Sequence, residues 1–396
     1  MLLFVKISVM NIVVVGGGFG GVKAALEMSK RNLGNITLIS DTSYFLHHAT
    51  LYSTATGKST SESVIPLDEI FAYHPKVRVV IDKMSSIEPL RKLVVCGKRS
   101  YEYDQLVIAI GSVTSYFNIN GVAEHSYGIK SLEEVKAFNG HLRDEIMTQR
   151  HLDKEYVIIG AGPTGIELAG VLKDYIQYLL DISHMPKHQK IRLTIVEAAP
   201  RILPRSSNAA SHLVMKRLKS IGVRVLINHK VEALDTEFIT IDGKQVPTET
   251  AVWTSGVANN PFFASHSEYF NLAKNGRVEV DEHLRAHNNI YVIGDNNTVK
   301  YSGTALPAFD QAKFVARHLF RIKNHRTLRK FHPHEPPTGL PVGKKWGYVE
   351  WHGIYVVGKA GYLTKRLIEL YGYCQIIPLK KALVLWKAHN IPEIEL

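Results

Sequence analysis

Two glycine-rich turns in this sequence have the residue types and the spacing that bind the pyrophosphate of a dinucleotide. Each follows a short apolar run and precedes a helix-like pattern, which is the order of strand, turn and helix in a dinucleotide-binding unit. In the second turn, Gly160 permits the tight bend, Gly162 lets the backbone approach the phosphates, and Gly165 lets the helix pack closely on the strand. The phosphates are then expected at the positive end of the helix dipole. The first turn contains Gly16, Gly18, Phe19, Gly20 and Gly21, and the second also contains Pro163 and Thr164.

Acidic residues follow the strands that accompany these turns. A carboxylate about 20 residues beyond the glycines meets the adenosine ribose in such units. Beyond the first turn, Asp41 satisfies this count, whereas Ser40 directly closes the next expected strand, so both are candidates for the ribose contact. A later buried strand pattern, at 289–293, is followed by Gly294 and Asp295.

The elements that must position these residues form two alternating β/α units, each with a small antiparallel insertion, followed by a basic tail. Strands are expected at 11–15, 36–39, 77–81, 92–96, 103–110, 157–159, 191–196, 223–227, 238–241, 251–254 and 289–293. Helices are expected at 22–30, 166–182, 212–219 and 308–322, and from a capping box at Ser131 and Glu134 towards Met147. The repeated plan indicates an α/β fold with two Rossmann-like dinucleotide-binding domains.

The composition narrows the class of protein further. A chain of 396 residues with 45% hydrophobic and 21% charged residues suits two or three folded domains. No apolar run reaches the roughly 20 residues of a membrane-spanning helix. The first nine residues carry no cleavage pattern, so we expect no signal peptide, and Met10 is an alternative start. The two cysteines, Cys96 and Cys374, fit a reducing cytoplasm and form no close redox pair.

The net charge of +12 is concentrated at the C-terminal end. Residues 313–387 carry 15 Lys or Arg and three acids, and the rest of the chain is balanced. Two segments around a break at Pro378 each have one apolar helical face with cations on the other side. These faces contain Leu363, Leu367 and Leu370, and Leu379, Leu383 and Trp386. We expect an amphipathic region that binds an anionic membrane surface. Two ordinary surface helices are the alternative, and nucleic acid is disfavoured because interleaved aromatic stacking residues are not evident.

Several motifs, in order, resemble the flavoprotein reductases that bind two dinucleotides. They are the two glycine turns, Ala109-Ile110-Gly111-Ser112 and Gly294-Asp295. Within that class, three stretches look like type II NADH dehydrogenases, the single-chain NADH:quinone oxidoreductases of the membrane surface. These stretches are GPTGIELAG at 162–170, VWTSGV at 252–257, and Tyr44-Phe45 through Leu51-Tyr52 to Ala55-Thr56-Gly57. The likeness covers essentially the whole chain.

The resemblance implies FAD on the first unit and NADH on the second. It divides the chain into FAD-binding segments at 1–115 and 266–330, an NADH-binding segment at 116–265, and a membrane-associating region at 331–396. The implied FAD contacts are Gly16, Gly18, Phe19, Gly20, Gly21, Ser40 or Asp41, Met84, Gly111, Gly294, Asp295, Ala305 and Leu306. The implied NADH contacts are Gly160, Gly162, Pro163, Thr164, Gly165, Glu167, Glu197 and Gly256.

Two glutamates carry the most specific implications of this resemblance. Glu167 matches a glutamate that lies beside both the nicotinamide and the flavin, so it is the expected catalytic residue. Glu197 closes its strand and would accept the adenosine-ribose hydroxyls. A carboxylate there repels the extra phosphate of NADPH, which favours NADH.

The electron-acceptor side departs from the family pattern. The motif Ala-Gln-x-Ala-x-Gln-Gln stands here as Ala305-Leu306-Pro307-Ala308-Phe309-Asp310-Gln311, so only the last glutamine remains. Asp310, Gln311 and Lys365 are the candidates for a quinone site. The resemblance implies a flavoenzyme that passes hydride from NADH to FAD and two electrons to a membrane quinone, without proton pumping. Two alternatives stay open: a soluble NADH reductase of a ferredoxin- or rubredoxin-like protein, and an NADH-binding flavoprotein that acts as a sensor.

The expected location is the cytoplasmic face of the cell membrane, as a peripheral protein, and the apolar tail could equally form a homodimer interface. The 19 histidines are scattered without metal-ligand spacing. Hydride transfer requires no general base on the protein. We therefore expect neither a metal nor a nucleic-acid partner.

Overall fold

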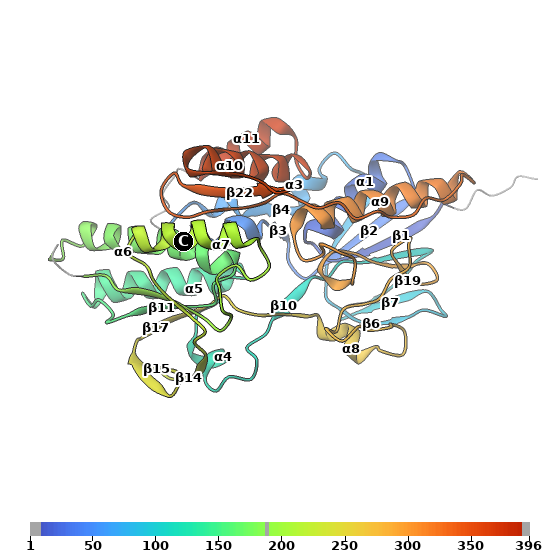
Figure 1. Cartoon of the computed structure of the whole chain (residues 1–396). Coiled ribbons are helices and arrows are strands. Elements are labelled where there is room, and N and C mark those ends of the chain that lie inside the picture. Colours follow the sequence, from blue (N-terminus) through green and yellow to red (C-terminus); the bar gives the residue numbers. More distant parts are fainter. Residues whose placement is uncertain (1–8, 187–189, 390–396) are drawn as a thin grey trace, which may run out of the picture.

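The computed structural model describes residues 9–186 and 190–389 as two α/β lobes side by side, with a C-terminal unit across both (Figure 1). The expectation that no signal peptide is present falls on residues 1–8, which lie outside the described residues. In the described ranges, no helix is long and apolar enough to cross a membrane.

The first lobe is built on a six-stranded sheet. Its strands in spatial order are β19 (Arg285–His287), β20 (Ile290–Val292), β9 (Gln105–Ile108), β1 (Asn11–Val15), β2 (Asn35–Ser40) and β5 (Val77–Ile81). All neighbours are parallel except β19 and β20. Alternate residues of β1 point into two different cores, as a strand buried on both faces requires. Ile12 and Val14 pack with the helices, whereas Val13 and Val15 face a small antiparallel sheet. The helices are α1 (Phe19–Lys30) and α9 (Ala305–Lys323), and the small sheet is β6 (Met84–Glu88), β7 (Leu93–Cys96) and β8 (Ser100–Glu102).

The second lobe repeats this plan with a parallel four-stranded sheet. Its strands in spatial order are β13 (Arg224–Ile227), β12 (Leu193–Glu197), β11 (Tyr156–Ile159) and β17 (Thr250–Trp253). Ile158 of β11 packs with the helices α5 (Leu132–Arg143), α6 (Pro163–Ile182) and α7 (Asn208–Ser220). Its neighbours Val157 and Ile159 face the sheet of β14 (Val231–Leu234), β15 (Phe238–Ile241) and β16 (Lys244–Pro247). The internal repeat expected from the two glycine turns is therefore present in three dimensions.

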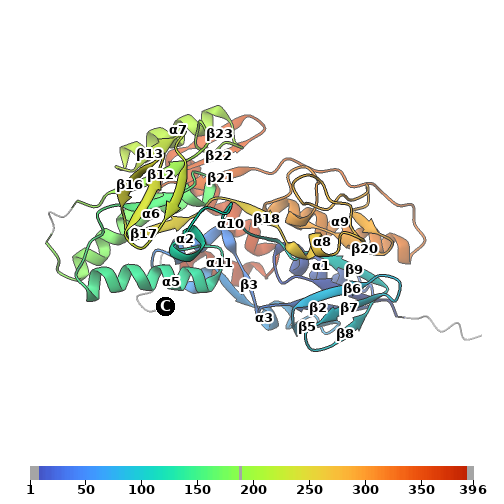
Figure 2. The ribbon, with the colours of Figure 1, turned by 90° about the horizontal axis from the view of Figure 1, so that it is seen from below.

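The chain crosses between the lobes on a two-stranded ribbon. Strand β10 (Ser112–Thr114) leaves the first lobe and pairs antiparallel with β18 (Val257–Asn259), which returns to it. Figure 2 shows β18 crossing the space between the lobes.

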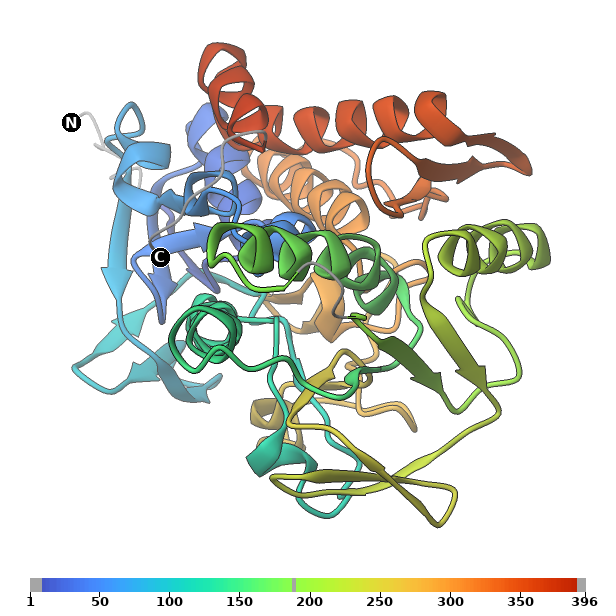
Figure 3. The same cartoon turned by 90° about the vertical axis from the view of Figure 1, so that its left-hand side faces the viewer.

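The C-terminal unit belongs to both lobes. It contains β21 (Thr338–Pro341), β22 (Gly347–Trp351), β23 (Ile354–Val357), α10 (Gly358–Cys374) and α11 (Leu379–Ala388). Leu340 and Tyr348 join the core of the second lobe, whereas Tyr373 and Ala382 join the core of the first. Gly361 lets α10 lie directly on β22, because a Cβ there would come within 2.4 Å of the Gly347 carbonyl oxygen. Figure 3 shows α10 running along one outer edge of the molecule.

The helices begin closer to their turns than the sequence pattern indicated. Helix α1 begins at Phe19, α6 at Pro163 and α9 at Ala305, each three residues earlier than expected. Pro163 is tolerated at the first helical position because its missing N–H has no partner there. The capping box of Ser131 and Glu134 is confirmed. The sequence pattern did not indicate the short elements α2 (Leu51–Thr54), α3 (Leu67–Phe71), α4 (Val122–His125), α8 (Pro261–Ser265), β3 (Tyr44–Leu46), β4 (Val64–Pro66), the 3-10 turns His48–Thr50, Thr60–Glu62 and Gly294–Asn296, and the π-helical turn Asp144–Thr148.

Candidate functional site

A single cleft of about 1890 Å³ lies between the two lobes, and both glycine turns open into it. The carboxyl ends of parallel strands point towards it from each side, which is where ligands bind in doubly wound sheets. Lys365, Ile368 and Glu369 of α10 close one end of the cleft. The cleft therefore joins two candidate nucleotide sites and a third wall from the C-terminal unit.

The first glycine turn has the geometry that a pyrophosphate requires. Gly16 adopts a φ of +117°, and a Cβ there would come within 2.1 Å of the Ala109 carbonyl oxygen. Gly21 is equally restricted, since its Cβ would meet the Gly16 carbonyl oxygen at 1.9 Å. A Cβ on Gly18, in contrast, would meet nothing within 4 Å, so this backbone faces the open cleft. The residues present therefore fit the diphosphate of FAD.

The two candidates for the adenosine-ribose contact differ in where they point. Ser40 is buried at the end of β2, and its hydroxyl lies under the turn, 2.2 Å from where a Cβ on Gly17 would be. Asp41 is exposed and lines the cleft. Met84, the residue expected near the adenine, lines the same region. The geometry therefore favours Asp41.

At the other end of the FAD site, a network of hydrogen bonds holds the loop that carries Asp295. The Ser112 hydroxyl donates to the Asp295 carboxylate at 3.1 Å, and the Gly111 N–H donates to the Asn296 side chain at 2.9 Å. Lys130, from the second lobe, reaches across to the Ser112 hydroxyl at 3.2 Å. Gly294 adopts a φ of +74°. This network ties the two lobes together at the Asp295 carboxylate.

The second glycine turn repeats the geometry of the first. A Cβ on Gly160 would lie 2.1 Å from the Ser255 hydroxyl, and one on Gly165 would lie 2.1 Å from the Gly160 carbonyl oxygen. A Cβ on Gly162 would meet nothing within 4 Å. Pro163, Thr164 and Gly256 line the cleft beside this turn. A second diphosphate fits here.

Glu197 closes β12 and faces the cleft beside this second turn. Its two carboxylate oxygens accept hydrogen bonds from the backbone N–H groups of Ala161 and Ala199, both at 2.8 Å. These bonds fix the carboxylate where an adenosine ribose is expected.

Glu167 begins a chain of ionisable groups that runs from the cleft into α10. Its carboxyl lies 3.9 Å from the Lys365 ammonium, which is 3.4 Å from the Glu369 carboxylate. Arg366 pairs with the same Glu369 at 2.5 Å. All four residues are 3–8% exposed. Burial raises the pKa of Glu167 to about 8, against the opposing charge of Lys365. The pKa of Glu369 is lowered, because the two cations outweigh its burial.

The residues predicted for the acceptor side do not lie together. Lys365 lines the cleft with Ala305 and Leu306, whereas Asp310 and Gln311 do not. Asp310 pairs with Lys313 at 3.5 Å. Gln311 is fully buried and accepts the Gly294 N–H at 2.8 Å, so its place in the structure is beneath the Asp295 loop.

Three cleft residues have no counterpart in the sequence predictions. Lys130 directly precedes the capping box, and His47 and Glu369 line the α10 side of the cleft. The His47-His48 pair in a motif-bearing loop was the only available signal. Nothing in the local pattern marks Lys130 or Glu369, because their partners are distant in the sequence.

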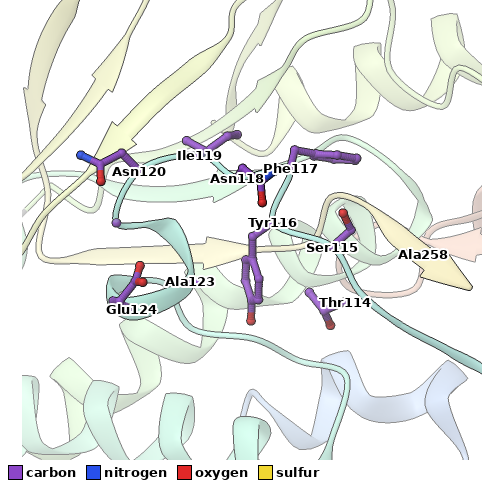
Figure 4. Close-up of a pocket in the computed structure, with 11 residues that line it drawn as sticks. Thr114, Ser115, Tyr116, Phe117, Asn118, Ile119, Asn120, Ala123, Glu124 and Ala258 are labelled. Atoms are coloured by element: carbon purple, nitrogen blue, oxygen red, sulfur yellow. The ribbon is translucent and has the colours of Figure 1, made fainter. Parts of the chain in front are cut away.

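A second, open cavity of about 810 Å³ lies at the lobe crossing, lined by residues 114–121 and by Ala123, Glu124 and Ala258 (Figure 4). Phe117 lines both this cavity and the cleft. Its ring packs edge-on against Trp253 at 6.1 Å. The ring also fills the space beside Gly256, where a Cβ would lie within 2.6 Å of it. This aromatic contact forms part of the cleft wall beside the β10–β18 ribbon.

The cysteines and the possible metal ligands complete the survey of reactive side chains. Within residues 9–186 and 190–389, no group of three or more His, Cys, Asp or Glu side chains is placed to hold a metal ion. Cys96 is buried, Cys374 is half-buried, and both are free thiols. The two lobes, two phosphate-binding turns and two strand-end carboxylates define a reductase that holds two dinucleotides face to face.

Comparison with known proteins places the chain in a family of this class. Residues 10–312 match the pyridine nucleotide-disulphide oxidoreductases, and the chain belongs to that family. A type II NADH:quinone oxidoreductase of Staphylococcus epidermidis is 28% identical over 381 residues, covering 91% of this chain and 94% of that protein. The type II NADH:quinone oxidoreductase NdhA of Mycobacterium tuberculosis is 29% identical, covering 92% and 84%.

A solved structure has the same fold. NDH2 from Plasmodium falciparum in complex with NADH superposes with a TM-score of 0.84 at 18% identity, covering 96% of this chain and 98% of that one. The fold class inferred from the sequence, two dinucleotide-binding domains with small antiparallel insertions, is confirmed, and so is the resemblance to type II NADH dehydrogenases.

Proposed function

We propose that this protein is an NADH:quinone oxidoreductase that uses FAD, as its relatives' names and its own cleft both indicate. The observation that carries the proposal is the single cleft that joins Glu197, Asp295 and the α10 wall. The predicted enzyme class and the predicted cofactors, FAD and NADH, agree with the family and with the named relatives. A dedicated reductase of a small iron–sulfur protein and a sensor without turnover are not favoured.

In this proposal the protein binds and orients the two nucleotides and shields them from water. FAD, when bound, accepts hydride from NADH and passes two electrons to the acceptor. The first turn and Asp41 hold FAD, and Met84 and Asp295 contact its two ends. The second turn holds the NADH diphosphate, while Glu197 selects NADH over NADPH. Glu167 retains a proton at neutral pH, because its pKa is about 8, and so offers an O–H donor between the two sites.

The acceptor is proposed to enter between α9 and α10. Leu306 and Ile368 line this part of the cleft and offer apolar surface to a flat ring. Lys365 lines the same cleft, and its ammonium lies 3.9 Å from the Glu167 carboxyl and 3.4 Å from the Glu369 carboxylate. This arrangement suits a quinone, which needs apolar contact for the ring and proton donors for its oxygens. Overall, NADH, one proton from solvent and the quinone become NAD+ and the quinol.

Exposed apolar side chains on the C-terminal unit support binding to a membrane surface. On α10, Leu363, Leu367 and Tyr371 are 54%, 52% and 50% exposed and follow one another at a spacing of four residues. On α11, Leu379 and Val384 are 58% and 65% exposed. The exposed cations Lys359, Lys380 and Lys387 lie on the same helices. We propose that this face binds the cytoplasmic side of an anionic membrane.

The structure corrects part of the sequence interpretation of this region. Trp386 was expected on the apolar outer face, but its indole N–H donates to the Arg366 carbonyl oxygen at 2.6 Å. Arg366 has the spacing of the outward cations, but it is buried because it pairs with Glu369. Lys365, predicted for the quinone side, is buried as well and lines the cleft. Leu370 packs against the core of the first lobe.

Stopped-flow spectroscopy of the FAD-loaded protein tests the proposal. We expect NADH to bleach the flavin within the turnover time, and ubiquinone-1 to restore its colour. Bleaching without reoxidation by the quinone would exclude a quinone reductase and favour a protein acceptor. Absence of bleaching would leave only the sensor. The domain boundaries, the absence of proton pumping and a homodimer through the C-terminal unit remain predictions.

A further inference from the structure

A second group of buried ionisable side chains lies beneath α10 and α11, apart from both glycine turns. Its centre is Glu62, which is 0% exposed on the 3-10 turn Thr60–Glu62. One carboxyl oxygen of Glu62 accepts a hydrogen bond from the Ser53 hydroxyl. The other lies 3.0 Å from Nδ1 of His389, at the end of α11. Burial of an acid is costly unless it stays protonated or paired, so this group calls for an explanation.

The surroundings of Glu62 favour the form that carries a proton. Burial raises its pKa, and the nearby Glu369 of α10 adds to that effect. His389 and, more weakly, Arg366 oppose it. The phenols of Tyr52, Tyr362 and Tyr373 complete the titratable groups that face Glu62. Glu62 therefore retains its proton to a higher pH than an exposed glutamate does.

Buried hydroxyl groups and an imidazole lie between the main chain of Glu62 and the cleft. Tyr373 donates to the Glu62 carbonyl oxygen, and its ring stacks on His47 with 4.5 Å between centroids. The Thr50 hydroxyl lies 3.4 Å from Nδ1 of His47 and 2.8 Å from the Ser63 hydroxyl. All of these side chains are at most 3% exposed.

His47 is the member of this group that reaches the cleft. Burial lowers its pKa to about 3, so its ring is neutral. A neutral ring has one nitrogen that donates and one that accepts, and so it can pass a proton from one to the other. His47 lines the cleft together with Lys365 and Glu369.

The reaction proposed above consumes one proton from solvent in each turnover. The Lys365 ammonium lines the cleft and is placed to hand a proton to the acceptor, but Lys365 is only 8% exposed and must be resupplied. His389 is the ionisable group of this cluster whose side chain, 12% exposed, borders solvent while contacting Glu62.

We propose that the Glu62–His389 pair is the entry point for the proton that the acceptor receives. His389 takes a proton from solvent on its imidazole and transfers one from Nδ1 to the Glu62 carboxyl. Glu62 then releases its proton to the Ser53 hydroxyl, its partner on the carboxyl, and the proton passes by way of the buried hydroxyls and His47 to Lys365. No electron moves in this pathway, and the O–H bond of the quinol is the bond finally formed. This inference rests on the proposed quinone reductase function.

The test replaces Glu62 with glutamine and His389 with glutamine, one at a time, in the FAD-loaded full chain. Glu62→Gln keeps an oxygen for Ser53 and a side chain of the same shape, but it cannot carry a proton. We expect bleaching of the flavin by NADH to be unchanged. Reoxidation by ubiquinone-1 should slow roughly tenfold or more, with a changed solvent deuterium isotope effect. Sodium formate, a small proton carrier, should restore the rate in both variants.

The matched control is Glu69→Gln. Glu69 also ties α11 to the first lobe, through Lys381, but it lies on the exposed surface. The Glu69→Gln substitution breaks a similar contact outside the buried group, so it should leave both half-reactions unchanged. If Glu62→Gln keeps its FAD and melting temperature and reoxidises at the wild-type rate, the proposal is overturned. A slow variant that formate does not restore would assign the pair a structural role instead.

The behaviour of the wild-type protein distinguishes failure of the proton pathway from failure of the proposed quinone reductase function. If wild-type flavin is bleached but ubiquinone-1 does not reoxidise it, the proposed function fails and the proton pathway fails with it. If wild-type protein completes both half-reactions and neither variant differs from it, only the proton pathway is refuted.

Discussion

Glu167 shows how burial of one side chain sets the chemistry available at the junction of the two nucleotide sites. Its pKa rises to about 8 because desolvation outweighs the attraction of Lys365 at 3.9 Å. A carboxyl that is neutral at pH 7 donates a hydrogen bond, whereas a carboxylate only accepts one. Protonation of Glu167 therefore gives the enzyme two forms, which interconvert at a pH near its pKa of about 8.

Glu167→Gln is expected to remove the pH-dependent change between these two forms. Glutamine donates a hydrogen bond at every pH, so the rate of flavin bleaching by NADH should lose the step that wild-type protein shows near its Glu167 pKa of about 8. Stopped-flow measurement between about pH 6 and about pH 10 checks this. A step that persists in the variant at the same pH would assign the titration to another group.

Glu145 gives a second prediction, for stability rather than activity. It is 2% exposed, and one oxygen accepts hydrogen bonds from the Asp153 N–H and the Tyr156 hydroxyl. Burial raises its pKa from 4.5 to about 7. The unfolded chain loses this proton first as pH rises, so the stabilisation is complete below about pH 4.5 and is lost as pH rises through 7.

Glu145→Gln should remove the loss of folding stability at high pH, because the amide does not ionise. At about pH 8 the variant should be more stable than wild type by about 1–3 kcal/mol, and the difference should vanish towards about pH 4.5. Urea unfolding at both pH values measures it. Glu249→Gln, at an exposed carboxylate in the same region, is the control and should change neither value. Equal stability of Glu145→Gln and wild type at the higher pH would contradict the raised pKa.

For single residues, the sequence predicted those that belong to a local motif. Glu197, Asp295 and Glu167 all line the cleft, although their contacts with cofactors remain predictions. Lys130 and Glu62 were not predicted, because only packing of distant elements gives them a role. No local pattern distinguishes such residues from surface charges.

Among the elements, α10 serves the interior and the exterior at once. Lys365, Ile368 and Glu369 face the cleft, and Leu363 and Leu367 point away from the protein. The helix therefore carries the acceptor side of the active site on one face and the proposed membrane contact on the other. A bound membrane lies one helix diameter, roughly 10 Å, from the proposed acceptor site.

Replacing Leu363, Leu367 and Tyr371 with glutamine should release the protein from lipid vesicles. Each side chain is about half exposed, so its transfer into lipid contributes about 1 kcal/mol, and the triple variant should bind roughly 100-fold more weakly. Sedimentation with vesicles measures this. Leu90 and Tyr73, at 100% and 89% exposed, lie outside this unit, and their replacement by glutamine is the matched control. Undiminished binding of the triple variant would remove α10 from the contact.

For α10 and α11, the apolar periodicity predicted which residues share a face, but not which face is exposed and which packs against the protein. Trp386 and Arg366 have the spacing of an outer apolar face and of its cations, yet they pair with each other inside. The glycine-turn helices were predicted more successfully, because a strand, a tight turn and a helix form one local unit. The starts of α1, α6 and α9 were each placed three residues too late, because the apolar periodicity becomes visible only after the first turn of a helix.

Over the whole molecule, the positive charge belongs to one end of the chain. The net charge is +12, and the exposed lysines Lys359, Lys380 and Lys387 accompany the apolar face of α10 and α11. Each cation near an anionic membrane surface contributes about 1 kcal/mol, and salt screens this attraction.

Binding to vesicles that contain anionic lipid should therefore weaken as sodium chloride rises from about 0.05 M to about 0.5 M. Binding to neutral vesicles should be weaker and nearly independent of salt. Replacing the three lysines with glutamine should abolish the preference for anionic lipid while leaving flavin bleaching intact. A variant that still prefers anionic vesicles would place the charge contact elsewhere.

The plan of the whole molecule was predictable because it is a repeat. Two glycine turns in one chain indicate two nucleotide folds, and both are present. Their face-to-face arrangement was not predictable from either unit, because it depends on contacts such as that of Lys130 with Ser112. The same limit applies to the C-terminal unit, whose residues join the cores of both lobes.

The ribbon of β10 and β18 has a consequence for ancestry and for engineering. Ser112 pairs with Asn259 and Thr114 with Val257, so the chain leaves the first lobe and returns to it at adjacent points. The second lobe is thus a cassette inserted into the first at two neighbouring splice points, and any cassette exchanged for it must keep the surface that packs on Leu340 and Tyr348 of the C-terminal unit. A lineage could alter its choice of electron donor by such an exchange and keep the flavin, the membrane face and the acceptor route unchanged.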